Sequence, residues 1–186
     1  MRIIGGKLKG KLIQFLRVGK TRPLKDSVRE NIFNILKHSN KLNIIIEGSD
    51  ILDLYSGIGS FGIECISRGA NKVTFIEQEK SAYKILEKNL ENLKVIQNSK
   101  AINNKIENVI NKFKDKFSIF FLDPPFVDLE FIENLKMIKI NKMFNKRHLV
   151  IIHREKKSRP KVQPRMFSLI SNSKYLSNIY KHIGKF

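Results

Sequence analysis

Apolar residues near the start of the chain recur at the spacing of an amphipathic helix. Val28, Ile32 and Leu36 would share one face of a helix over residues 25–38, because side chains three and four positions apart lie on the same side of a helix. Before it, residues 2–18 alternate short apolar and basic runs around three glycines. This pattern predicts a small extension that resembles a β-hairpin.

From residue 50 onward, short apolar runs alternate with longer amphipathic stretches. They predict strands over residues 51–54, 73–76, 95–96, 119–122, 149–152, 165–170 and 176–181, the last two closing the sheet edge as a hairpin. The predicted helices between them cover residues 61–68, 81–93, 101–113 and 128–138. Repeated strand–helix units favour a parallel sheet covered by helices on both faces. Such sheets hold ligands beyond the carboxyl ends of their strands, so we expect the chemistry after strands one, two and four.

Basic residues gather at the two ends of the chain. The formal net charge is +19, of which residues 1–25 contribute +8, residues 26–135 contribute −2 and residues 136–186 contribute +13. A lysine-rich codon bias would add lysine everywhere and would not remove acids from both ends. The asymmetry therefore favours nucleic acid as a partner and divides the chain into a basic extension, residues 1–25, and a catalytic domain, residues 26–186. The candidate nucleic-acid contacts in the extension are Lys7, Lys9 and Lys11.

Other features narrow the class of protein. The single cysteine, Cys65, excludes an internal disulfide and fits a reducing compartment. No apolar run is long enough to cross a bilayer, and the first residues lack the apolar stretch of a signal peptide. The four histidines are scattered and accompany no cysteine cluster, so we expect no metal site. These features predict a cytoplasmic protein, and a monomer is the default.

A glycine-rich segment follows the first predicted strand of the sheet. Gly57, Gly59 and Gly62 have the dinucleotide-binding spacing, and Glu77 follows the first of them by 20 residues. An acid at that position can accept both hydroxyls of a ribose. The spacing fits a nicotinamide cofactor or S-adenosylmethionine, and a turn that only packs helix on strand is the simpler alternative. Asp53 favours S-adenosylmethionine, because a carboxylate there would repel a pyrophosphate but suits an ammonium and a sulfonium.

The tetrapeptide Asp123-Pro124-Pro125-Phe126 follows the fourth predicted strand of the sheet. Two prolines remove two N–H donors, so the segment only accepts hydrogen bonds. The Asp123 carboxylate and the Pro124 carbonyl can take both N–H groups of a planar amine, which favours a lone pair directed at a methyl carbon. Phe126 offers a face on which a base can stack. The motif therefore predicts methylation of an exocyclic amino group, against the alternative of a plain proline turn.

With these motifs, the sequence resembles the RsmD family of bacterial methyltransferases, which modify a guanine N2 in 16S ribosomal RNA. The opening signature consists of Met1 to Gly6, Thr21-Arg22-Pro23, Asp26, Val28-Arg29-Glu30 and Phe33-Asn34. The cofactor segment consists of Asp53 to Gly62, Glu64, Ser67-Arg68-Gly69-Ala70 and Phe75-Ile76-Glu77. Together with the proline motif, these segments make the match dense over residues 1–126. Beyond them, only the strand pattern and the basic character agree.

The resemblance implies a Rossmann-like class I methyltransferase fold with a mostly parallel, seven-stranded sheet and S-adenosylmethionine as methyl donor. It implies catalytic roles for Asp123, Pro124, Pro125 and Phe126. The cofactor contacts expected with it are Asp53, Tyr55, Ser56, Gly57, Gly59, Glu77, Gln78 and Ser99. Arg22 and Arg29, in the opening signature, would contact RNA or brace the active site. Family members carry an aspartate just before the alanine that opens the third helix, where this chain has Lys100, with Asn98 or Ser99 as substitutes.

The function expected from these features is methyl transfer to guanine N2 of 16S RNA in the small ribosomal subunit. Because the proline motif does not distinguish guanine from adenine, an N6-adenine methyltransferase acting on nucleic acid is an alternative. A nicotinamide-dependent oxidoreductase is disfavoured by Asp53. A protein of another class, a non-catalytic RNA-binding factor in ribosome assembly, would share the fold and the charge but not the turnover.

Overall fold

The computed structural model describes residues 1–15, 24, 26–38, 42, 44–125 and 130–153, and the backbone of residues 179–182. Its helices are α1 (Asp26–His38), α2 (Ser60–Ser67), α3 (Lys80–Asn92), α4 (Ile106–Val109) and α5 (Glu130–Ile140). Its strands are β1 (Asp50–Leu54), β2 (Lys72–Glu77), β3 (Ser99–Asn103), β4 (Phe117–Leu122), β5 (Phe144–His153) and β6 (Ile179–His182). Two short 3-10 turns complete it, η1 (Ile96–Asn98) and η2 (Ile110–Lys112).

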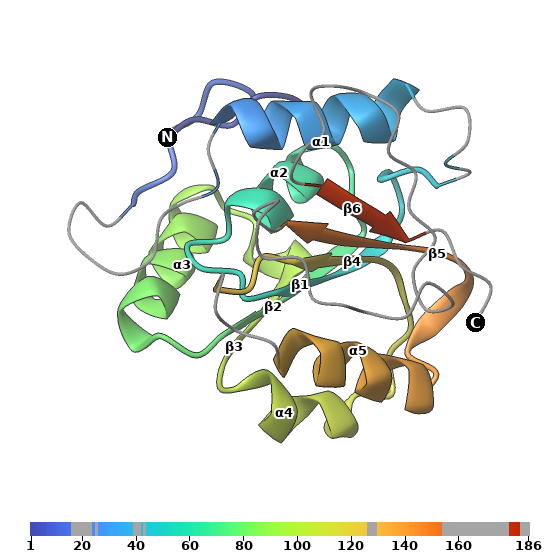
Figure 1. Ribbon diagram of the computed structural model, residues 1–186. Helices are drawn as coiled ribbons and strands as arrows, with labels where there is room; N and C mark the ends of the chain where they lie inside the picture. The colour runs from blue at the N-terminus through green and yellow to red at the C-terminus, as the bar shows by residue number, and fades with distance from the viewer. Residues whose placement is uncertain are drawn as a thin grey trace.

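The strands form one sheet in the order β3-β2-β1-β4-β5-β6 (Figure 1). The first five are parallel, as the alternation of strands and helices predicted, and β6 runs antiparallel to β5. Leu54 pairs with Ile76 on one side and with Leu122 on the other, and Leu122 pairs with Ile152. The carboxyl ends of β2, β1, β4 and β5 therefore lie level at one edge, and the chain order reverses there between β1 and β4.

The described residues contribute six strands to the sheet, whereas seven were expected. The strand predicted over residues 165–170 lies outside the described residues. The strand predicted over residues 176–181 corresponds to β6, which closes the edge beside β5.

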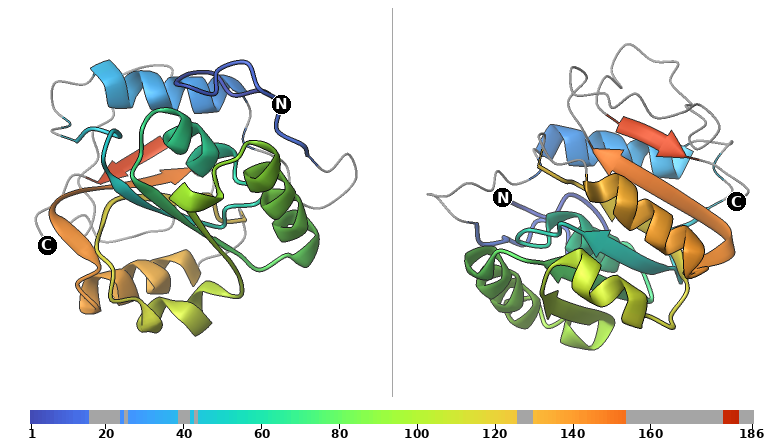
Figure 2. Two further views of the ribbon diagram at one scale, coloured as in Figure 1. Left: turned by 180° about the vertical axis from the view of Figure 1, so that it is seen from behind. Right: turned by 60° about the horizontal axis from the view of Figure 1, so that its bottom comes forward.

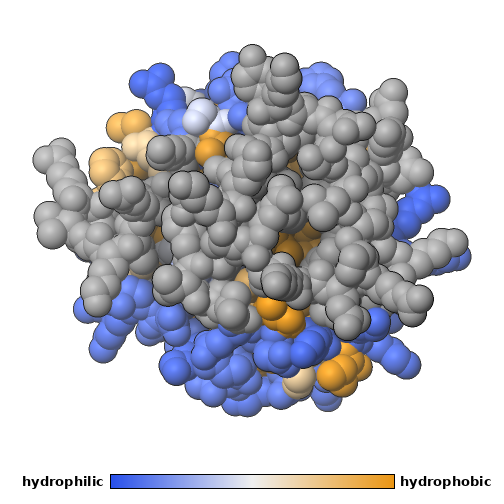
Figure 3. Space-filling view, in the orientation of Figure 1, coloured by the Kyte–Doolittle hydropathy of each residue, from blue (hydrophilic) through white to orange (hydrophobic). Residues whose placement is uncertain are grey.

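Helices cover both faces of the sheet, as Figures 1 and 2 show. Phe75 and Phe121 face a core that includes α1, α2 and α3, whereas Leu54 and Leu122 face a second core beneath α4 and α5. Figure 3 shows a mostly hydrophilic surface over α4 and α5, as expected for helices whose outer sides meet water. Within the described ranges, no helix combines the length and apolar character needed to cross a membrane.

The third strand of the sheet lies four residues later than predicted. Val95 and Ile96 belong to the turn after α3 and to η1, and the strand runs over Ser99–Asn103. The helix predicted over residues 101–113 is accordingly short, because β3 occupies its first residues. The prediction was wrong because β3 is an edge strand with no fully buried residue. It therefore lacks the apolar run that marked the central strands.

The amino-terminal segment does not form the predicted hairpin of two strands. Arg2 and Leu12 make one isolated antiparallel bridge. Between them the backbone turns toward α2, where the Lys7 N–H donates to the Ser67 carbonyl at 2.7 Å and the Leu8 N–H donates to Ser67 Oγ at 2.9 Å. A Cβ on Gly6 would overlap the Ser67 backbone, and its φ of 75° also favours glycine. Hydrogen bonds to α2 thus accompany a reduced pairing within the segment, in which the Ile3 N–H donates to the Lys11 carbonyl and the Ile13 N–H donates to the Met1 carbonyl, each at 2.9 Å.

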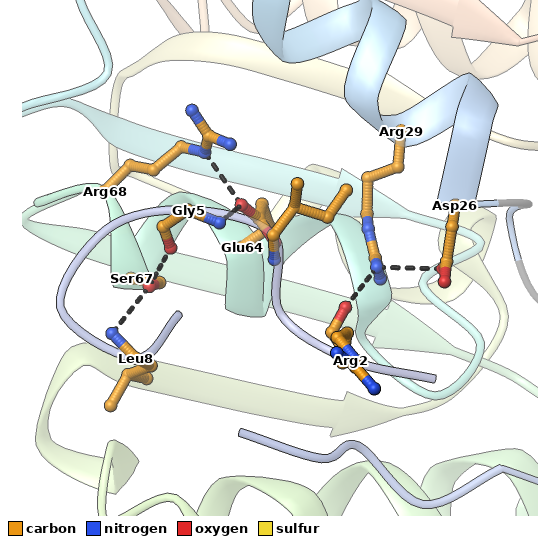
Figure 4. Close-up of polar contacts among 9 residues, drawn as sticks. Arg2, Gly5, Leu8, Asp26, Arg29, Glu64, Ser67 and Arg68 are labelled. Carbon is orange, nitrogen blue, oxygen red and sulfur yellow. Dashed lines mark hydrogen bonds and ion pairs between the residues drawn. The ribbon is translucent and has the colours of Figure 1, made fainter. Parts of the chain in front are cut away.

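A buried carboxylate on α2 holds this segment in place (Figure 4). Glu64, which is 0% exposed, accepts hydrogen bonds from the backbone N–H groups of Ile4 and Gly5, each at 2.8 Å. Its other contact is the Arg68 guanidinium, 2.8 Å away and stacked over the ring of Phe33. A charge so deeply buried is stable only when its oxygens are paired, and here backbone and guanidinium supply the partners.

We predict that Glu64→Gln lowers the free energy of unfolding by about 1–3 kcal/mol, because one amide that now meets a carboxylate oxygen would meet an NH2 group. Urea unfolding followed by circular dichroism measures this change. Glu133→Gln is the matched control, since Glu133 forms an exposed ion pair with Lys136 on α5, and surface pairs contribute little. Equal stability of wild type and Glu64→Gln would contradict a structural role for Glu64.

Candidate active site

Four polar side chains lie on one face of the sheet at its carboxyl edge. Alternate side chains of a strand point to opposite faces, and Asp53, Glu77, Asp123 and His153 belong to the alternate set that faces α1 and α2. They come from β1, β2, β4 and β5, and in β4 the residue follows directly after the strand. The reversal between β1 and β4 thus brings together the strand ends at which the sequence predicted chemistry.

The loop after β1 has the conformation for which its glycines are needed. Gly57 and Gly59 have φ angles of 55° and 84°, a region that disfavours other residues, although Tyr55 also adopts a φ of 59°. A Cβ on Gly59 would lie 2.5 Å from the Leu86 side chain, and one on Gly62 would overlap the ring of Phe75. These two glycines are explained by packing. At Gly57, in contrast, a Cβ would meet nothing within 4 Å, which leaves space for a ligand beside the backbone.

Glu77 holds this loop from the end of β2. One of its carboxylate oxygens accepts a hydrogen bond from the Gly57 N–H at 2.7 Å, and the other accepts from the Glu79 N–H at 2.7 Å. Burial raises the pKa of Glu77, and the hydrogen bonds from these N–H groups oppose that rise. Each oxygen keeps a further lone pair, so the carboxylate can shape the loop and accept ligand hydroxyls at the same time.

Asp53 is a buried carboxylate whose hydrogen bonding is incomplete. Its Oδ2 accepts from the Gly62 N–H at 3.0 Å, while its buried Oδ1 has no hydrogen-bond partner within the described part of the chain. Burial raises the pKa of Asp53 well above its usual value, and the charges of Asp123 and Glu77 raise it further. A cationic N–H donor beside Oδ1 would stabilise the carboxylate. The ammonium group of S-adenosylmethionine fits that requirement, and the open side of Gly57 provides space for the cofactor.

Tyr55 and Ser56 are held in the loop by hydrogen bonds. Ser56 is buried, and both its N–H and its hydroxyl donate to the Ile76 carbonyl, at 3.1 and 3.3 Å. The Tyr55 hydroxyl accepts from the Asn134 side-chain amide on α5 at 3.0 Å. Gln78 is exposed at the end of β2. These positions border the glycine loop, as their assignment to the cofactor requires.

The structure does not bring Ser99 to this group of residues. Ser99 pairs with Val73 near the amino end of β2, and its hydroxyl donates to the Val95 carbonyl. Lys100 follows it in the first half of β3, with its ammonium 5.3 Å from the centre of the Phe113 ring. The assignment of Ser99 to the cofactor, and of Lys100 to the position of the family's aspartate, were both wrong because β3 begins later than predicted. The residue just beyond the carboxyl end of β3 is Asn104, whose N–H donates to the Glu77 carbonyl at 3.2 Å, and no pattern in the sequence indicates it.

The four residues assigned to catalysis lie at or beyond the end of β4. Asp123 is 25% exposed by its side chain, Pro124 is buried and Pro125 is exposed. Phe126 lies outside the described residues. The Asp123 Oδ1 atom lies 2.7 Å from Nδ1 of His153, the last residue of β5. The sequence assigns no role to His153, which is one of four scattered histidines, because only the pairing of β4 with β5 reveals its partner.

The residues assigned to RNA fall into different environments. Lys7, Lys9 and Lys11 are all exposed on the amino-terminal segment. Arg29 is 0% exposed, and its guanidinium donates to the Arg2 carbonyl and to Asp26 Oδ1, the latter at 3.0 Å (Figure 4). Burial lowers the pKa of Arg29, while Asp26 opposes that change. The RNA contact expected for Arg29 is therefore wrong, since the side chain braces α1 against the segment. Arg22 lies outside the described residues.

Comparisons with known proteins agree with this fold. The profile of the family Conserved hypothetical protein 95 matches residues 1–183. Ribosomal RNA small subunit methyltransferase D of Buchnera aphidicola is 33% identical over 156 residues, 83% of this chain and 78% of the relative. The Haemophilus influenzae protein of the same name is 31% identical over 173 residues, 91% of this chain and 86% of the relative. A solved Escherichia coli structure of a proposed methyltransferase superimposes with a TM-score of 0.79 at 28% identity, covering 97% of this chain and 94% of that one.

Fold, site and relatives together define a Rossmann-like methyltransferase whose methyl donor is S-adenosylmethionine. Because the profile covers almost the whole chain and the relatives exceed 30% identity over most of it, the chain belongs to the RsmD family.

We predict that Gly57→Ala weakens binding of S-adenosylhomocysteine by about tenfold or more, because the added methyl group occupies the open side of the loop. Isothermal titration calorimetry measures the affinity. Gly48→Ala is the matched control, since Gly48 also has a positive φ, 70°, and a Cβ there also meets nothing within 4 Å. Each variant should lose about 1–2 kcal/mol of stability through backbone strain, but only Gly57→Ala should lose affinity. Similar affinities for the two variants would contradict a cofactor role for the loop.

Proposed function

We propose that the protein transfers a methyl group from S-adenosylmethionine to the exocyclic N2 of a guanine in 16S ribosomal RNA of the small subunit. The observation that carries the proposal is the position of Asp123. It follows β4 directly, on the same face as Asp53 and Glu77, and two prolines follow it. The names of the relatives, which specify small-subunit ribosomal RNA, support this substrate.

In the proposed reaction, the residues around the amine accept hydrogen bonds from it and donate none to it. The Asp123 carboxylate and the Pro124 carbonyl would each accept one N–H of the guanine amine, which keeps the nitrogen lone pair away from both contacts. S-adenosylmethionine, when bound, supplies the electrophilic methyl group. The methyl group replaces one amine proton, which leaves to Asp123 or to water. Asp53 and Glu77 would hold the ammonium and ribose ends of the cofactor, and Phe126 would stack on the base.

We further propose that the amino-terminal extension, residues 1–25, binds RNA backbone. Lys7, Lys9 and Lys11 are exposed, and the segment that carries them is attached to α2 by the hydrogen bonds of Glu64 and Ser67. A backbone that is already ordered loses little conformational entropy when the lysines that it carries meet phosphates. Because α2 follows the glycine loop directly, the extension would hold RNA on the same body that holds the cofactor.

The decisive experiment is transfer of a labelled methyl group from S-adenosylmethionine to small ribosomal subunits that lack the modification, followed by nucleoside analysis. We expect N2-methylguanine, and we expect Asp123→Ala to reduce the rate by about a hundredfold or more, because it removes an acceptor aimed at the reacting amine. N6-methyladenine as the product would overturn the guanine assignment. Tight RNA binding without any transfer would favour a non-catalytic assembly factor.

The RNA-binding role of the extension has its own test. Replacing Lys7, Lys9 and Lys11 by Gln should weaken RNA binding and reduce the steepness of log affinity against log salt by about 2. The reason is that a protein with fewer phosphate contacts releases fewer counterions from the RNA when it binds. Affinity for S-adenosylhomocysteine should not change. The matched control replaces Lys136, Lys139 and Lys142, which are exposed at and after α5 on the other side of the sheet. If the two triple variants behave alike, net charge and not the extension determines binding.

A further inference from the structure

The contact between Asp123 and His153 is unexplained by the functions assigned so far. The two residues lie one position beyond the pair Leu122 and Ile152, on adjacent parallel strands. Asp123 Oδ1 and His153 Nδ1 are 2.7 Å apart, a short distance typical of a charge-assisted hydrogen bond. The two strands, β4 and β5, lie side by side in Figure 1. The contact therefore joins the proposed catalytic carboxylate to a residue 30 positions away in sequence.

The two described residues that follow Asp123 cannot donate a backbone hydrogen bond to its carboxylate. An aspartate at a turn commonly accepts a hydrogen bond from the backbone N–H two residues later. Here that residue is Pro125, and Pro124 also lacks an N–H. In the part of the chain that the structure describes, His153 is the side-chain partner of the Asp123 carboxylate. Without it, a carboxylate that is 25% exposed would be free to rotate and to bind water.

The chemistry of the two groups determines the direction of the hydrogen bond. An ionised carboxylate only accepts, so Nδ1 of His153 carries the proton and donates it to Oδ1. This arrangement occupies one carboxylate oxygen and leaves Oδ2 for another donor. The alternating pattern places two further carboxylates, Asp53 and Glu77, on the same face of the sheet. A donor from β5 thus also holds Asp123 in place near groups of like charge.

His153 is itself held firmly enough to act as a fixed reference. Its backbone pairs with Ile179 of β6, and the residue before it, Ile152, pairs with Leu122 of β4. Its side chain is only 15% exposed. A partner whose backbone belongs to a paired strand can fix the rotamer of Asp123, which lies just beyond the end of its own strand.

We propose that His153 is a positioning residue for methyl transfer: its Nδ1–H fixes the Asp123 carboxylate so that Oδ2 faces the amine of the base. The proposal rests on the proposed function, since it assigns to Asp123 the role of amine acceptor. It adds a residue outside the proline motif and the glycine loop to the machinery of the reaction. Its consequence is that orientation of the amine depends on the pairing of β4 with β5, and not on the motif alone.

The test compares His153→Leu with His153→Asn. Leucine removes the hydrogen bond, whereas the asparagine side-chain NH2 can take the position of Nδ1 and donate to the same oxygen. We expect His153→Leu to lower kcat by about tenfold to a hundredfold, as misorientation of a reacting group does, with KM for both substrates and affinity for S-adenosylhomocysteine nearly unchanged. His153→Asn should restore most of the lost rate.

Asn145→Ala is the control for a purely structural effect. Asn145 of β5 donates to Ser118 Oγ of β4 at 2.9 Å. The substitution therefore removes a polar contact between the same two strands, at the end opposite to His153. This variant should lower stability without lowering kcat. Unchanged kcat in His153→Leu would overturn the proposal. A His153→Asn variant as slow as His153→Leu would also overturn it, because the imidazole ring and not its hydrogen-bond donor would then be required. Absence of transfer by the wild type would instead refute the proposed function.

Discussion

Parallel pairing in register brings the polar residues of the candidate site together. Leu54 is level with Ile76 and with Leu122, and Leu122 is level with Ile152, so side chains at the ends of four strands face the same side of the sheet. A shift of one residue in any of these strands would turn its polar residue to the opposite face. The geometry of the candidate site is thus a property of the sheet, and the motifs supply only the chemical groups.

The helix after the glycine loop transmits this order to the amino-terminal segment. All eight residues of α2 are buried, because the sheet, α1 and the segment surround it. Rings of Phe33, Phe61 and Phe121 stack through these layers, with centroids 5.3 and 3.9 Å apart. On the other side of the loop, the Asn89 amide donates to the carbonyls of Gln14 and Ile58, both at 3.1 Å. The basic extension and the cofactor loop therefore share their supports.

The parts of the fold that the sequence predicted well are those with a strong local signal. Strands β1, β2 and β4 are buried on both faces and each contains at least three apolar residues, so their positions could be predicted within one or two residues. The edge strand β3 has no such run, and the error there displaced Ser99 and Lys100 from their true positions. The hairpin expected at the amino terminus is reduced to one bridge for another reason, because the N–H groups of Ile4, Gly5 and Leu8 find acceptors in Glu64 and Ser67, which are distant in sequence.

The sequence by itself determined the chemistry available to this protein. Glycine spacing, the acids Asp53 and Glu77, and Asp123 followed by two prolines can be recognised without coordinates, because each depends on neighbouring residues or on spacing along the chain. Tertiary structure alone decided which side chains hold these groups. His153 meets Asp123 because β4 lies beside β5, and Arg29 is a buried brace and not an RNA contact because the amino-terminal backbone folds over it. Contacts of this kind depend on register and burial, which no local pattern in a single sequence records.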